Sequence, residues 1–402
     1  MFSLYMLIWG SQYIVYNYLP IYIDSLPFAT NTTTGFAVAL GSAVIMVSQP
    51  FWGAMADRAK TKNMVLGIGL LCSAGFIFLF LIEQQSTAML FLCVAAFYFF
   101  FLARQTVVDT ISLENLDALG VPYSRFRAGG SCGSALTALC LSFFPGISSS
   151  TVFLVFALML LLSLLPFALA PKTAGHQYKA DQTAGDTAPV KKASFIDLLK
   201  NKKLMLIISF VFLGFISNSF MTTFFPVYYA TERGLNAGTG MLSTFMFIAI
   251  IIEAVLMLFS HRTFDHFHVY TVLLMAPAGA ILRCICLYFI DNPYLLLPTT
   301  FLQMLCYAPY FVAVVPLINR IVPDELKASG QSLWAIAAFG LSPVFGNIAG
   351  GAISDLLGGI RNAFGVLIFY NLILFLVYFF LFARQKKRDQ ALEQSQTSSA
   401  VD

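Results

Sequence analysis

Residues 204–229 read LMLIISFVFLGFISNSFMTTFFPVYY, a stretch of 26 residues with no charged side chain. A helix needs about 20 mostly apolar residues to cross the hydrocarbon core of a bilayer. Outward from this stretch, in both directions, lie eleven further stretches of mostly apolar character: 3–23, 34–54, 63–83, 87–110, 129–145, 150–170, 240–260, 269–290, 294–318, 329–353 and 363–383. The sequence therefore predicts twelve transmembrane helices.

The composition agrees with a membrane-embedded chain. Of the 402 residues, 59% are hydrophobic and 10% are charged, whereas a soluble globular protein has about 45–50% apolar and about 25% charged residues. So few charged side chains cannot cover the surface that a soluble chain of this length exposes to water. A soluble enzyme, a disordered protein and a nucleic-acid binder are thereby excluded, and we expect an all-α polytopic membrane protein.

One long polar segment, 171–203, divides the twelve stretches into six and six. We expect an N-terminal six-helix bundle over 1–170, a cytoplasmic linker over 171–203, a C-terminal six-helix bundle over 204–384 and a cytoplasmic tail over 385–402. Residues 195–200, FIDLLK, are expected to form a short amphipathic turn on the membrane. The polar tail after Arg384 is expected to be disordered.

The two halves resemble each other weakly. Pro20-Ile21-Tyr22 ends the first stretch, and Pro226-Val227-Tyr228 ends the seventh, 206 positions later. The fifth stretch has Gly129 and Gly133 four residues apart, and the eleventh has Gly346 and Gly350; small residues at this spacing let helix backbones approach closely. Internal repeats of this kind are typical of secondary transporters.

The basic residues are distributed unevenly between the two sides of the membrane. Of the 23 Lys and Arg residues, only Arg233 and Arg361 fall in loops on one side, and Arg104 and Arg283 fall inside predicted spans. The other 19 lie on the side that holds both termini. Because basic loops stay in the cytoplasm, we expect both termini to be cytoplasmic and the protein to lie in the cell membrane. The net charge of +4 reflects this bias and indicates no nucleic-acid partner.

No segment has the pattern of a metal or cofactor site. His261, Asp265, His266 and His268 lie in one predicted loop, but a short turn seldom supplies the fixed geometry that a metal site needs. The chain has no Gly-x4-Gly-Lys-Ser/Thr loop for nucleotide phosphates, and all seven cysteines fall within predicted spans. We therefore expect no metal, no cofactor and no enzyme activity.

The loop between the second and third stretches carries the sharpest local motif. Residues 53–62 read GAMADRAKTK. Gly53 permits close helix packing, Asp57 can cap or pair with a neighbouring helix end, and Arg58 and Lys62 can latch onto a partner half through charge-assisted hydrogen bonds. The plain alternative is an ordinary basic cytoplasmic loop. Gly-x3-Asp-Arg with a following basic residue resembles the hallmark loop of the major facilitator superfamily, which implies two six-helix bundles and solute transport by alternating access.

A narrower resemblance lies around the fourth and fifth stretches. Val108-Asp109 precedes a short loop, after which residues 123–133 read YSRFRAGGSCG. This is similar to the oligosaccharide and nucleoside proton-symporter branch, which includes the lactose permease and the phenylpropionate-permease-like proteins. The resemblance implies a substrate-binding carboxylate at Asp109, its partner arginine at Arg127 and a proton-coupling arginine at Arg283. The tenth stretch departs from that branch, because residues 301–309, FLQMLCYAP, lack its histidine and glutamate. The branch's proton relay therefore does not carry over.

A few ionisable residues remain inside the predicted spans. An intramembrane charge costs at least about 2.5–3.5 kcal/mol, so each should face a cavity or a partner. Glu253, in the apolar run IIIEAV of 250–255, is expected to carry a proton or bind substrate, the alternative being a structural pair with Arg283. Asp109 is expected to pair with Arg127 in the cavity, or else to be an interfacial acid. Arg104 lies about 140° around the helix from Asp109 and is expected to reach the cytoplasmic headgroups.

Uncharged polar residues refine the expected cavity. Tyr13 and Asn17 lie one turn apart on the first stretch, Asn218 lies on the seventh and Gln303 on the tenth. Their rings and amides suit a sugar, a nucleoside or an aromatic acid. For most aromatic residues in so aromatic a chain, the alternative of lipid-facing packing is the better interpretation.

These observations predict a secondary transporter that carries a small solute together with protons. One alternative is a proton-antiport exporter of drugs or metabolites, since Gly340-Leu341-Ser342-Pro343 has some of the character of an exporter motif. A receptor or membrane enzyme on the same scaffold is disfavoured, because the longest polar segment has only 33 residues. The expected partners are the solute, protons and the bilayer, and we expect a monomer.

Overall fold

The computed structural model describes residues 1–101, 103–119, 123–174, 195–258, 266–323 and 326–399. Throughout these ranges the regular structure is helical. The chain forms two compact units. The first comprises 1–190, 220–251 and 343–360, and the second comprises 191–219, 252–342 and 361–402.

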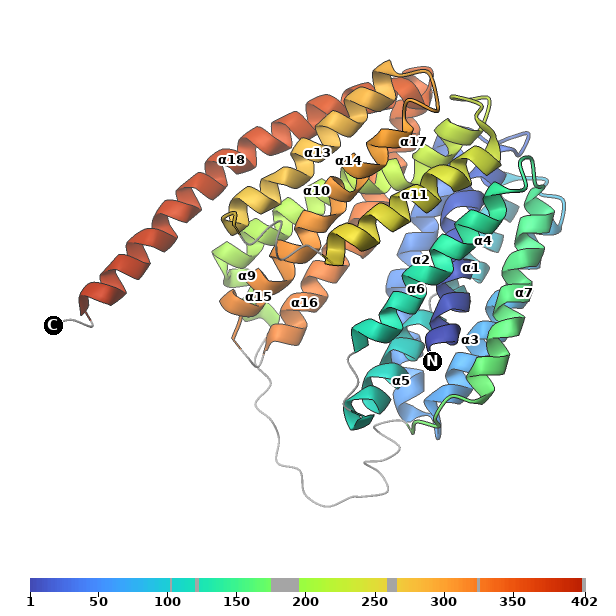
Figure 1. The fold of residues 1–402 in the computed structure, drawn as a ribbon, viewed down its shortest axis with the longest axis horizontal. Helices are drawn as coiled ribbons and strands as arrows, with labels where there is room; N and C mark the ends of the chain where they lie inside the picture. The colour runs from blue at the N-terminus through green and yellow to red at the C-terminus, as the bar shows by residue number, and fades with distance from the viewer. Residues whose placement is uncertain (102, 120–122, 175–194, 259–265, 324–325, 400–402) are drawn as a thin grey trace. The chain divides into compact units, whose positions relative to one another are not determined.

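The first unit is built around α1 (Figure 1). Its remaining helices are α2 (Asn31–Arg58), α3 (Lys62–Phe76), α4 (Thr87–Phe101), α5 (Ala103–Leu119), α6 (Tyr123–Ser142) and α7 (Ser149–Ala168), with a 3-10 extension of α3 over Ile77–Leu81. Helix α1 (Phe2–Asp24) packs against α6 and α7 and buries 15 of its 23 residues. A helix buried on most of its faces must place its polar side chains inside the protein as well.

Two glycines of α6 allow its backbone to approach α1. A Cβ at Gly133 would collide with the carbonyl group of Met6, and a Cβ at Gly129 would lie 2.8 Å from the carbonyl oxygen of Phe2. The predicted small-residue spacing therefore serves the α1–α6 contact. By contrast, a Cβ at Gly53 would meet nothing within 4 Å, so the close packing expected at Gly53 is absent from this structure.

The remaining helices are α9 (Phe195–Lys200), α10 (Lys202–Ala230), α11 (Gly238–Leu258), α13 (Val269–Phe289), α14 (Thr300–Pro309), α15 (Val315–Ile321), α16 (Lys327–Ala335), α17 (Ser342–Leu356) and α18 (Ile360–Ser399). Helices α10 and α11 are divided between the two units, and α17 belongs to the first unit except for Ser342. The short turn expected at 195–200 is helix α9.

Two spans of the second unit contain π-helical segments. Tyr310–Val314 joins α14 to α15, and Ile336–Leu341 joins α16 to α17. A proline follows each segment, at Pro316 and Pro343. Because proline has no backbone N–H to donate, the regular helical ladder cannot continue past it. The helix accommodates this by a local change of pitch, as π-bulges do.

Nine helical segments among the described residues are long and apolar enough to cross a membrane: 31–58, 62–81, 149–168, 202–230, 238–255, 269–289, 297–321, 329–356 and 360–391. They coincide with nine of the twelve predicted stretches. The other three, 3–23, 87–110 and 129–145, fall on α1, on α4 with α5, and on α6. The all-α membrane fold is thus confirmed, and the count of twelve spans stays a prediction.

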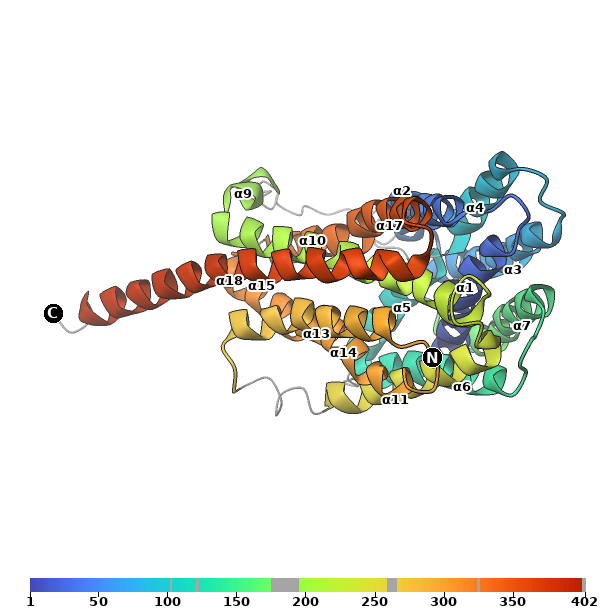
Figure 2. The same ribbon diagram turned by 90° about the horizontal axis from the view of Figure 1, so that it is seen from above.

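The expectation of a disordered tail was wrong. Helix α18 runs on to Ser399, and Figures 1 and 2 show it continuing past the other helices of its unit. Asp389 anchors the part that follows Arg384, since its carboxylate accepts hydrogen bonds from Lys203 Nζ at 2.7 Å and from the Tyr270 hydroxyl at 2.9 Å. A polar composition alone did not reveal these contacts across more than 100 residues of sequence.

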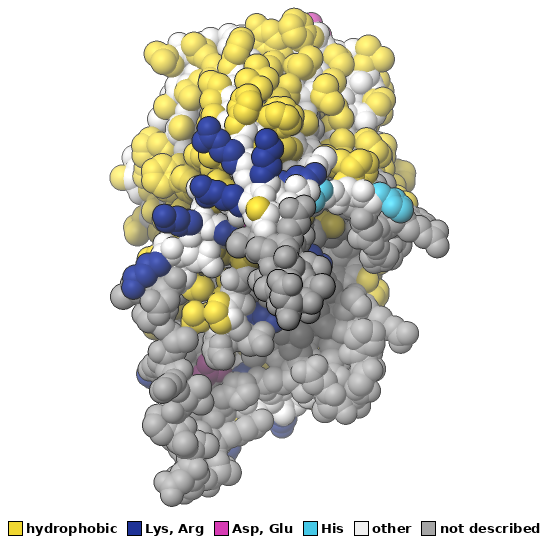
Figure 3. All heavy atoms as spheres, turned by 90° about the vertical axis from the view of Figure 1, so that its left-hand side faces the viewer, with side chains coloured by type: hydrophobic (Ala, Val, Ile, Leu, Met, Phe, Trp, Pro, Cys, Tyr) yellow, Lys and Arg dark blue, Asp and Glu magenta, His cyan; other side chains and the backbone are white. Residues whose placement is uncertain are grey.

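Basic side chains gather beside a broad hydrophobic surface on the face drawn in Figure 3. The exposed basic residues on α9, α10, α15 and α18 in the second unit are Lys200, Lys202, Arg320, Arg384, Lys387 and Arg388. All six belong to the side that the charge bias predicts to be cytoplasmic.

The two glycine environments predict opposite effects of one substitution. Gly133→Ala should lower the stability by about 1–3 kcal/mol, because the added methyl group has to displace the α1 backbone. Gly53→Ala should leave stability unchanged or raise it by up to about 1 kcal/mol through helix propensity. Thermal unfolding of the purified protein in detergent measures both; equal melting temperatures would contradict the described α1–α6 contact.

Candidate functional site

The polar side chains of α1 form two neighbouring sets. Tyr13 and Tyr18 both bond the hydroxyl of Ser243 on α11, at 3.3 and 2.7 Å, and both rings are buried. Asn17 is also buried, and its side-chain nitrogen donates to the Tyr13 carbonyl oxygen at 2.9 Å. The structure therefore brings together the predicted pair of Tyr13 and Asn17, but it gives the Tyr13 hydroxyl a protein partner.

The second set on α1 consists of Gln12 and Tyr16. Gln12 Nε2 donates to the Tyr16 hydroxyl at 3.0 Å, and the side-chain oxygen of buried Gln12 has no hydrogen-bond partner. Tyr16 is the most exposed tyrosine of the helix, at 41%. Its spacing from Gln12, one helical turn, was visible in the sequence; which face of α1 turns away from the packed core was not.

Asp109 has a partner that the sequence did not suggest. The hydroxyl of Tyr5, on α1, donates to Asp109 Oδ1 at 2.6 Å. The backbone of Arg127 lies in α6, but its side chain falls outside the described residues, so the predicted pair of Asp109 and Arg127 stays a prediction. A tyrosine hydroxyl can satisfy a partly buried carboxylate by donating a charge-assisted hydrogen bond to it.

The expectation that Arg104 reaches the headgroups was wrong. Its side chain is fully buried, with Nη1 donating to Ser11 Oγ and Nε donating to the Phe101 carbonyl oxygen, both at 2.7 Å. Snorkelling needs a path along the helix surface to the interface. Arg104 instead points into the first unit.

Predicted residues meet in the second unit as well. Arg283 on α13 is buried and its Nη2 donates to Gln303 Oε1 on α14 at 3.0 Å. On α10, Asn218 Nδ2 donates to the Cys306 carbonyl oxygen at 3.0 Å, and the Tyr307 hydroxyl donates to the Asn218 carbonyl oxygen at 3.4 Å. Helices α10, α13 and α14 thus share one polar cluster inside an apolar bundle.

Glu253, on α11, stands apart from this cluster. Among the described residues no hydrogen bond or ion pair joins Glu253 to Arg283, and the Glu253 side chain is exposed. The alternative of a structural Glu253–Arg283 pair is therefore not formed in this structure. The Glu253 carboxyl group, in the apolar run of 250–255, therefore lacks the compensation of an ion pair with Arg283.

A set of polar contacts at the junction of α1 and α2 was not anticipated from the sequence. Asp355, at the end of α17, accepts hydrogen bonds from the backbone N–H of Asn31 at 3.0 Å, from its side-chain nitrogen at 2.7 Å and from the backbone N–H of Thr32 at 2.7 Å. A carboxylate at a helix N-terminus satisfies unpaired N–H groups and interacts favourably with the helix dipole. Asp355 therefore caps α2 from another helix.

A second contact holds the same junction. Arg233 Nη1 forms an ion pair with Asp24 Oδ1 at 2.9 Å, and Nη2 donates to the Ala29 carbonyl oxygen at 2.8 Å. Gly351 and Gly35 allow α2 and α17 to lie close, since a Cβ on either would collide with the facing backbone. A small pocket of about 270 Å³ lies at this junction.

Two of the predicted latch residues pair with each other. Asp57 and the fully buried Lys62 form an ion pair at 3.7 Å. The backbone N–H of Lys62 donates to the Thr173 carbonyl oxygen at 2.7 Å, and Arg58 is exposed. Gly351-x3-Asp355 at the end of α17 has the same spacing as Gly53-x3-Asp57 in α2. The sequence signal for Asp355 was therefore present, but its meaning depends on a contact between distant helices.

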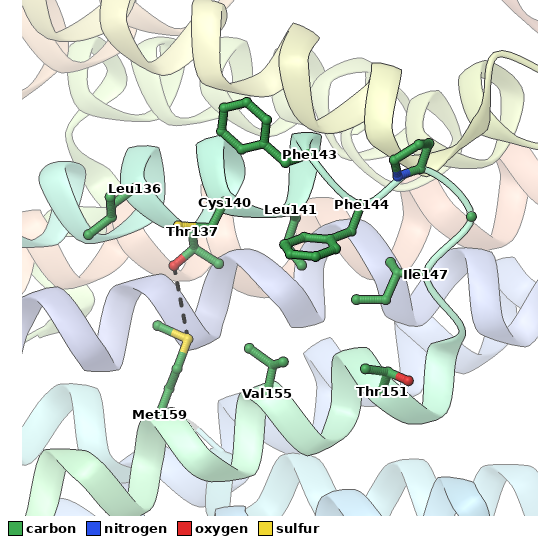
Figure 4. A pocket seen from close by; sticks show the side chains of 12 residues that line it. Leu136, Thr137, Cys140, Leu141, Phe143, Phe144, Ile147, Thr151, Val155 and Met159 are labelled. Atoms are coloured by element: carbon green, nitrogen blue, oxygen red, sulfur yellow. Dashed lines mark hydrogen bonds between the residues drawn. The ribbon is translucent and has the colours of Figure 1, made fainter.

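The larger pocket of the first unit is apolar. It has a volume of about 710 Å³ and lies between α6 and α7, where Phe143, Phe144, Val155 and Met159 are among the residues that line it (Figure 4). None of the predicted site residues lines this pocket, so it does not coincide with the predicted polar cavity.

Of the loop considered for a metal, His261 and Asp265 lie outside the described residues.

The cap on α2 predicts a stability difference between two aspartates. Asp355→Ala should lower the stability by about 2 kcal/mol, because it removes the hydrogen bonds that Asp355 accepts from Asn31 and Thr32 at the start of α2. Asp291→Ala is the matched control, since Asp291 pairs with Arg361 between exposed side chains, and such pairs contribute about 0–1 kcal/mol. Melting temperatures in detergent test this; an equal decrease in the two variants would contradict the cap.

Comparisons with known proteins agree with this architecture. Residues 1–366 match the MFS_1 like family. The uncharacterized transporter YwbF of Bacillus subtilis is 23% identical over 354 residues, which cover 87% of this chain and 85% of YwbF. The maltose permease of Geobacillus stearothermophilus is 22% identical over 356 residues, with 87% and 86% covered.

Solved transporter structures have the same fold. The nucleoside transporter NupG superposes with a TM-score of 0.79 at 16% identity, covering 94% of this chain and 98% of NupG. The peptide transporter POT, solved with sulfate, gives a TM-score of 0.73 at 15% identity, covering 95% and 93%. The relatives and the structural neighbours are transporters, and none is an enzyme. With a whole-chain family match, a helical membrane fold and polar clusters inside its bundles, this chain belongs to the MFS_1 like family of the major facilitator superfamily and is a membrane transporter.

Proposed function

We propose that this transporter carries a small solute together with protons, by alternating access, across the cell membrane with both termini in the cytoplasm. The observation that carries the proposal is Glu253. Glu253 belongs to the apolar helix α11, its side chain is exposed, and it has no ion-pair partner among the described residues. Intramembrane acids without a fixed partner mark proton pathways in transporters.

Protonation of Glu253 couples the proton to the solute in this scheme. A charged carboxylate in lipid-like surroundings costs at least about 2.5–3.5 kcal/mol, so a deprotonated, empty transporter resists closing around it. A bound proton removes the charge, and the loaded transporter then closes and reopens on the other side. Asp109 and Arg283 are the further groups that we assign to proton coupling, Asp109 through its bond with Tyr5.

We assign solute recognition to polar groups within each unit, taken separately. In the second unit we assign Asn218 and Gln303, which belong to the polar cluster around Arg283. In the first unit we assign Asp109, Arg127, Tyr13 and Asn17, of which Tyr13 would exchange Ser243 for solute. A maltose permease and a nucleoside transporter are among the similar proteins, which supports a sugar or a nucleoside as the solute class; an aromatic acid is the third class that we propose.

Alternating access needs a contact that closes each side in turn. The junction held by Asp355 and Arg233 lies on the side that the charge bias predicts to be external, and we assign it to external closure. Gly53, Asp57, Arg58 and Lys62 are assigned to the internal latch; in this structure Asp57 and Lys62 form an ion pair with each other at 3.7 Å. One chain holds both contacts, so we propose that a monomer is sufficient.

Proton-antiport export is the second candidate. The observation that favours it is the π-helical segment Ile336–Leu341, which ends next to Ser342 and Pro343 in the eleventh span. A change of pitch at such a place is suited to bending during transport. Export would show as resistance of cells to ethidium and loss of that resistance on deletion.

Glu253→Gln should separate solute movement from proton coupling. Gln has the shape of the protonated acid but cannot release a proton, so the variant should lose concentrative uptake while keeping solute exchange across the membrane. Proteoliposomes with an imposed pH gradient measure both, with radiolabelled maltose, uridine and phenylacetate as probes.

The matched control for this experiment is Glu232→Gln, which neutralises an exposed carboxylate in the loop between α10 and α11. It should transport like the unaltered protein. Full concentrative uptake by Glu253→Gln would remove Glu253 from the mechanism. Uptake of a probe without any response to the pH gradient, in the unaltered protein, would remove proton coupling altogether.

A further inference from the structure

Arg104 is a buried cation whose charge has no counterpart in the described protein. It lies at the start of α5, within the predicted fourth span, and its side chain is 0% exposed. Among the described residues it forms no ion pair with any Asp or Glu. Asp109, on the same helix, is bonded to Tyr5 instead. Burial of an uncompensated charge in a membrane bundle is costly and marks a functional position.

The guanidinium is only partly satisfied by neutral groups. Nε and Nη1 donate to the Phe101 carbonyl oxygen and to Ser11 Oγ, while Nη2 has no hydrogen-bond partner. The guanidinium carbon lies 4.5 Å from the centroid of the Phe101 ring and 5.4 Å from that of Phe156. Cation–π contacts stabilise the group without neutralising it. One strong donor therefore remains open.

Two features beside Arg104 point to a ligand. Gln12, next to Ser11 in α1, has a buried side-chain oxygen without a partner. The ring of Tyr16 meets the same Phe101 ring edge-on, with the centroids 6.3 Å apart, and is the exposed member of the group. Phe101 therefore contacts both the exposed Tyr16 ring and the buried Arg104 guanidinium. The first unit thus contains an open cationic donor, an open acceptor and an accessible aromatic ring.

We propose that Arg104 is the charge partner of an anionic solute, so that the substrate class is a carboxylic acid with a flat ring and a hydrogen-bond donor. The carboxylate pairs with the open side of the guanidinium, which favours two parallel hydrogen bonds to a carboxylate. Tyr16 stacks on or against the ring, and Gln12 accepts a hydrogen bond from the donor. This proposal rests on the proposed function and narrows its substrate class. Symport of a monoanion with one proton moves no net charge across the membrane.

A purely structural role for Arg104 is the competing account. Arg104 lies in the first turn of α5, and its bonds to the Phe101 carbonyl oxygen and to Ser11 on α1 could serve to hold α5 against α1. In that case substitution would destabilise the protein and would affect charged and neutral solutes alike. Stability and charge selectivity therefore distinguish the two accounts.

The test compares an acid with its neutral amide. Binding of 4-hydroxyphenylacetate and of 4-hydroxyphenylacetamide to the purified protein is measured by the shift in melting temperature and by competition for uptake in proteoliposomes. The unaltered protein should bind the acid at least tenfold more tightly than the amide. Arg104→Gln should lose that preference while melting at the same temperature or higher, because the uncompensated charge is gone. Arg104→Lys, which keeps the charge, should retain part of the preference.

Three results would overturn the proposal. One is binding of neither compound by the unaltered protein, and another is equal binding of both. The third is a melting temperature of Arg104→Gln several degrees below that of the unaltered protein, with both compounds affected equally. The proposed function fails separately: if maltose or uridine is taken up with protons while the acid is ignored, proton symport stands and the anionic substrate does not.

Discussion

The structure depends on one constraint: a charged or polar side chain inside a membrane bundle has to find its partner within the protein. Asp109 has Tyr5, Arg283 has Gln303, and Arg104 has Ser11 and the Phe101 carbonyl group. Each of these residues makes a contact that joins two different helices. Groups to which we assign solute binding or proton coupling therefore also help to position the helices, and the residues left without full compensation, Glu253 and Arg104, are the ones to which we assign a proton and a substrate charge.

The junction of α2 with Asp355 obeys the same constraint at a helix end. The first N–H groups of α2 have no partner inside their own helix, and Asp355 supplies one from α17. A cap that comes from another helix is lost when the two helices separate, whereas a cap within one helix is not. In the alternating access that we propose, the hydrogen bonds from α2 to Asp355 form only while this junction is closed. The shared Gly-x3-Asp spacing at the ends of α2 and α17 suggests that both ends of the transporter use one chemical device.

Much of the fold could be predicted from the sequence because a helix that crosses the lipid bilayer needs a long apolar stretch. Long apolar stretches located nine spans that the structure bears out, and Gly129 and Gly133 indicated close packing that α6 makes with α1. The site was harder. Helical periodicity groups Tyr13 with Asn17 and Gln12 with Tyr16, but it does not say which group faces the core. Partners such as Tyr5 for Asp109, 104 residues away, arise only from packing. The surroundings of Arg104 likewise arise only from packing and cannot be read from the sequence pattern. The same is true of the contact between Asp389 and Lys203, which lies in a tail that was expected to be disordered.

The central claim is that solute and proton move together, and one recording tests it most directly. De-energised vesicles that contain the protein are supplied in turn with maltose, uridine, 4-hydroxyphenylacetate and ethidium while the pH of the weakly buffered medium is followed. Symport predicts that one of the first three makes the medium more alkaline, because protons leave it with the solute, and that Glu253→Gln vesicles give no such response. Acidification on addition of ethidium, with no response to the others, would contradict symport and indicate export by antiport.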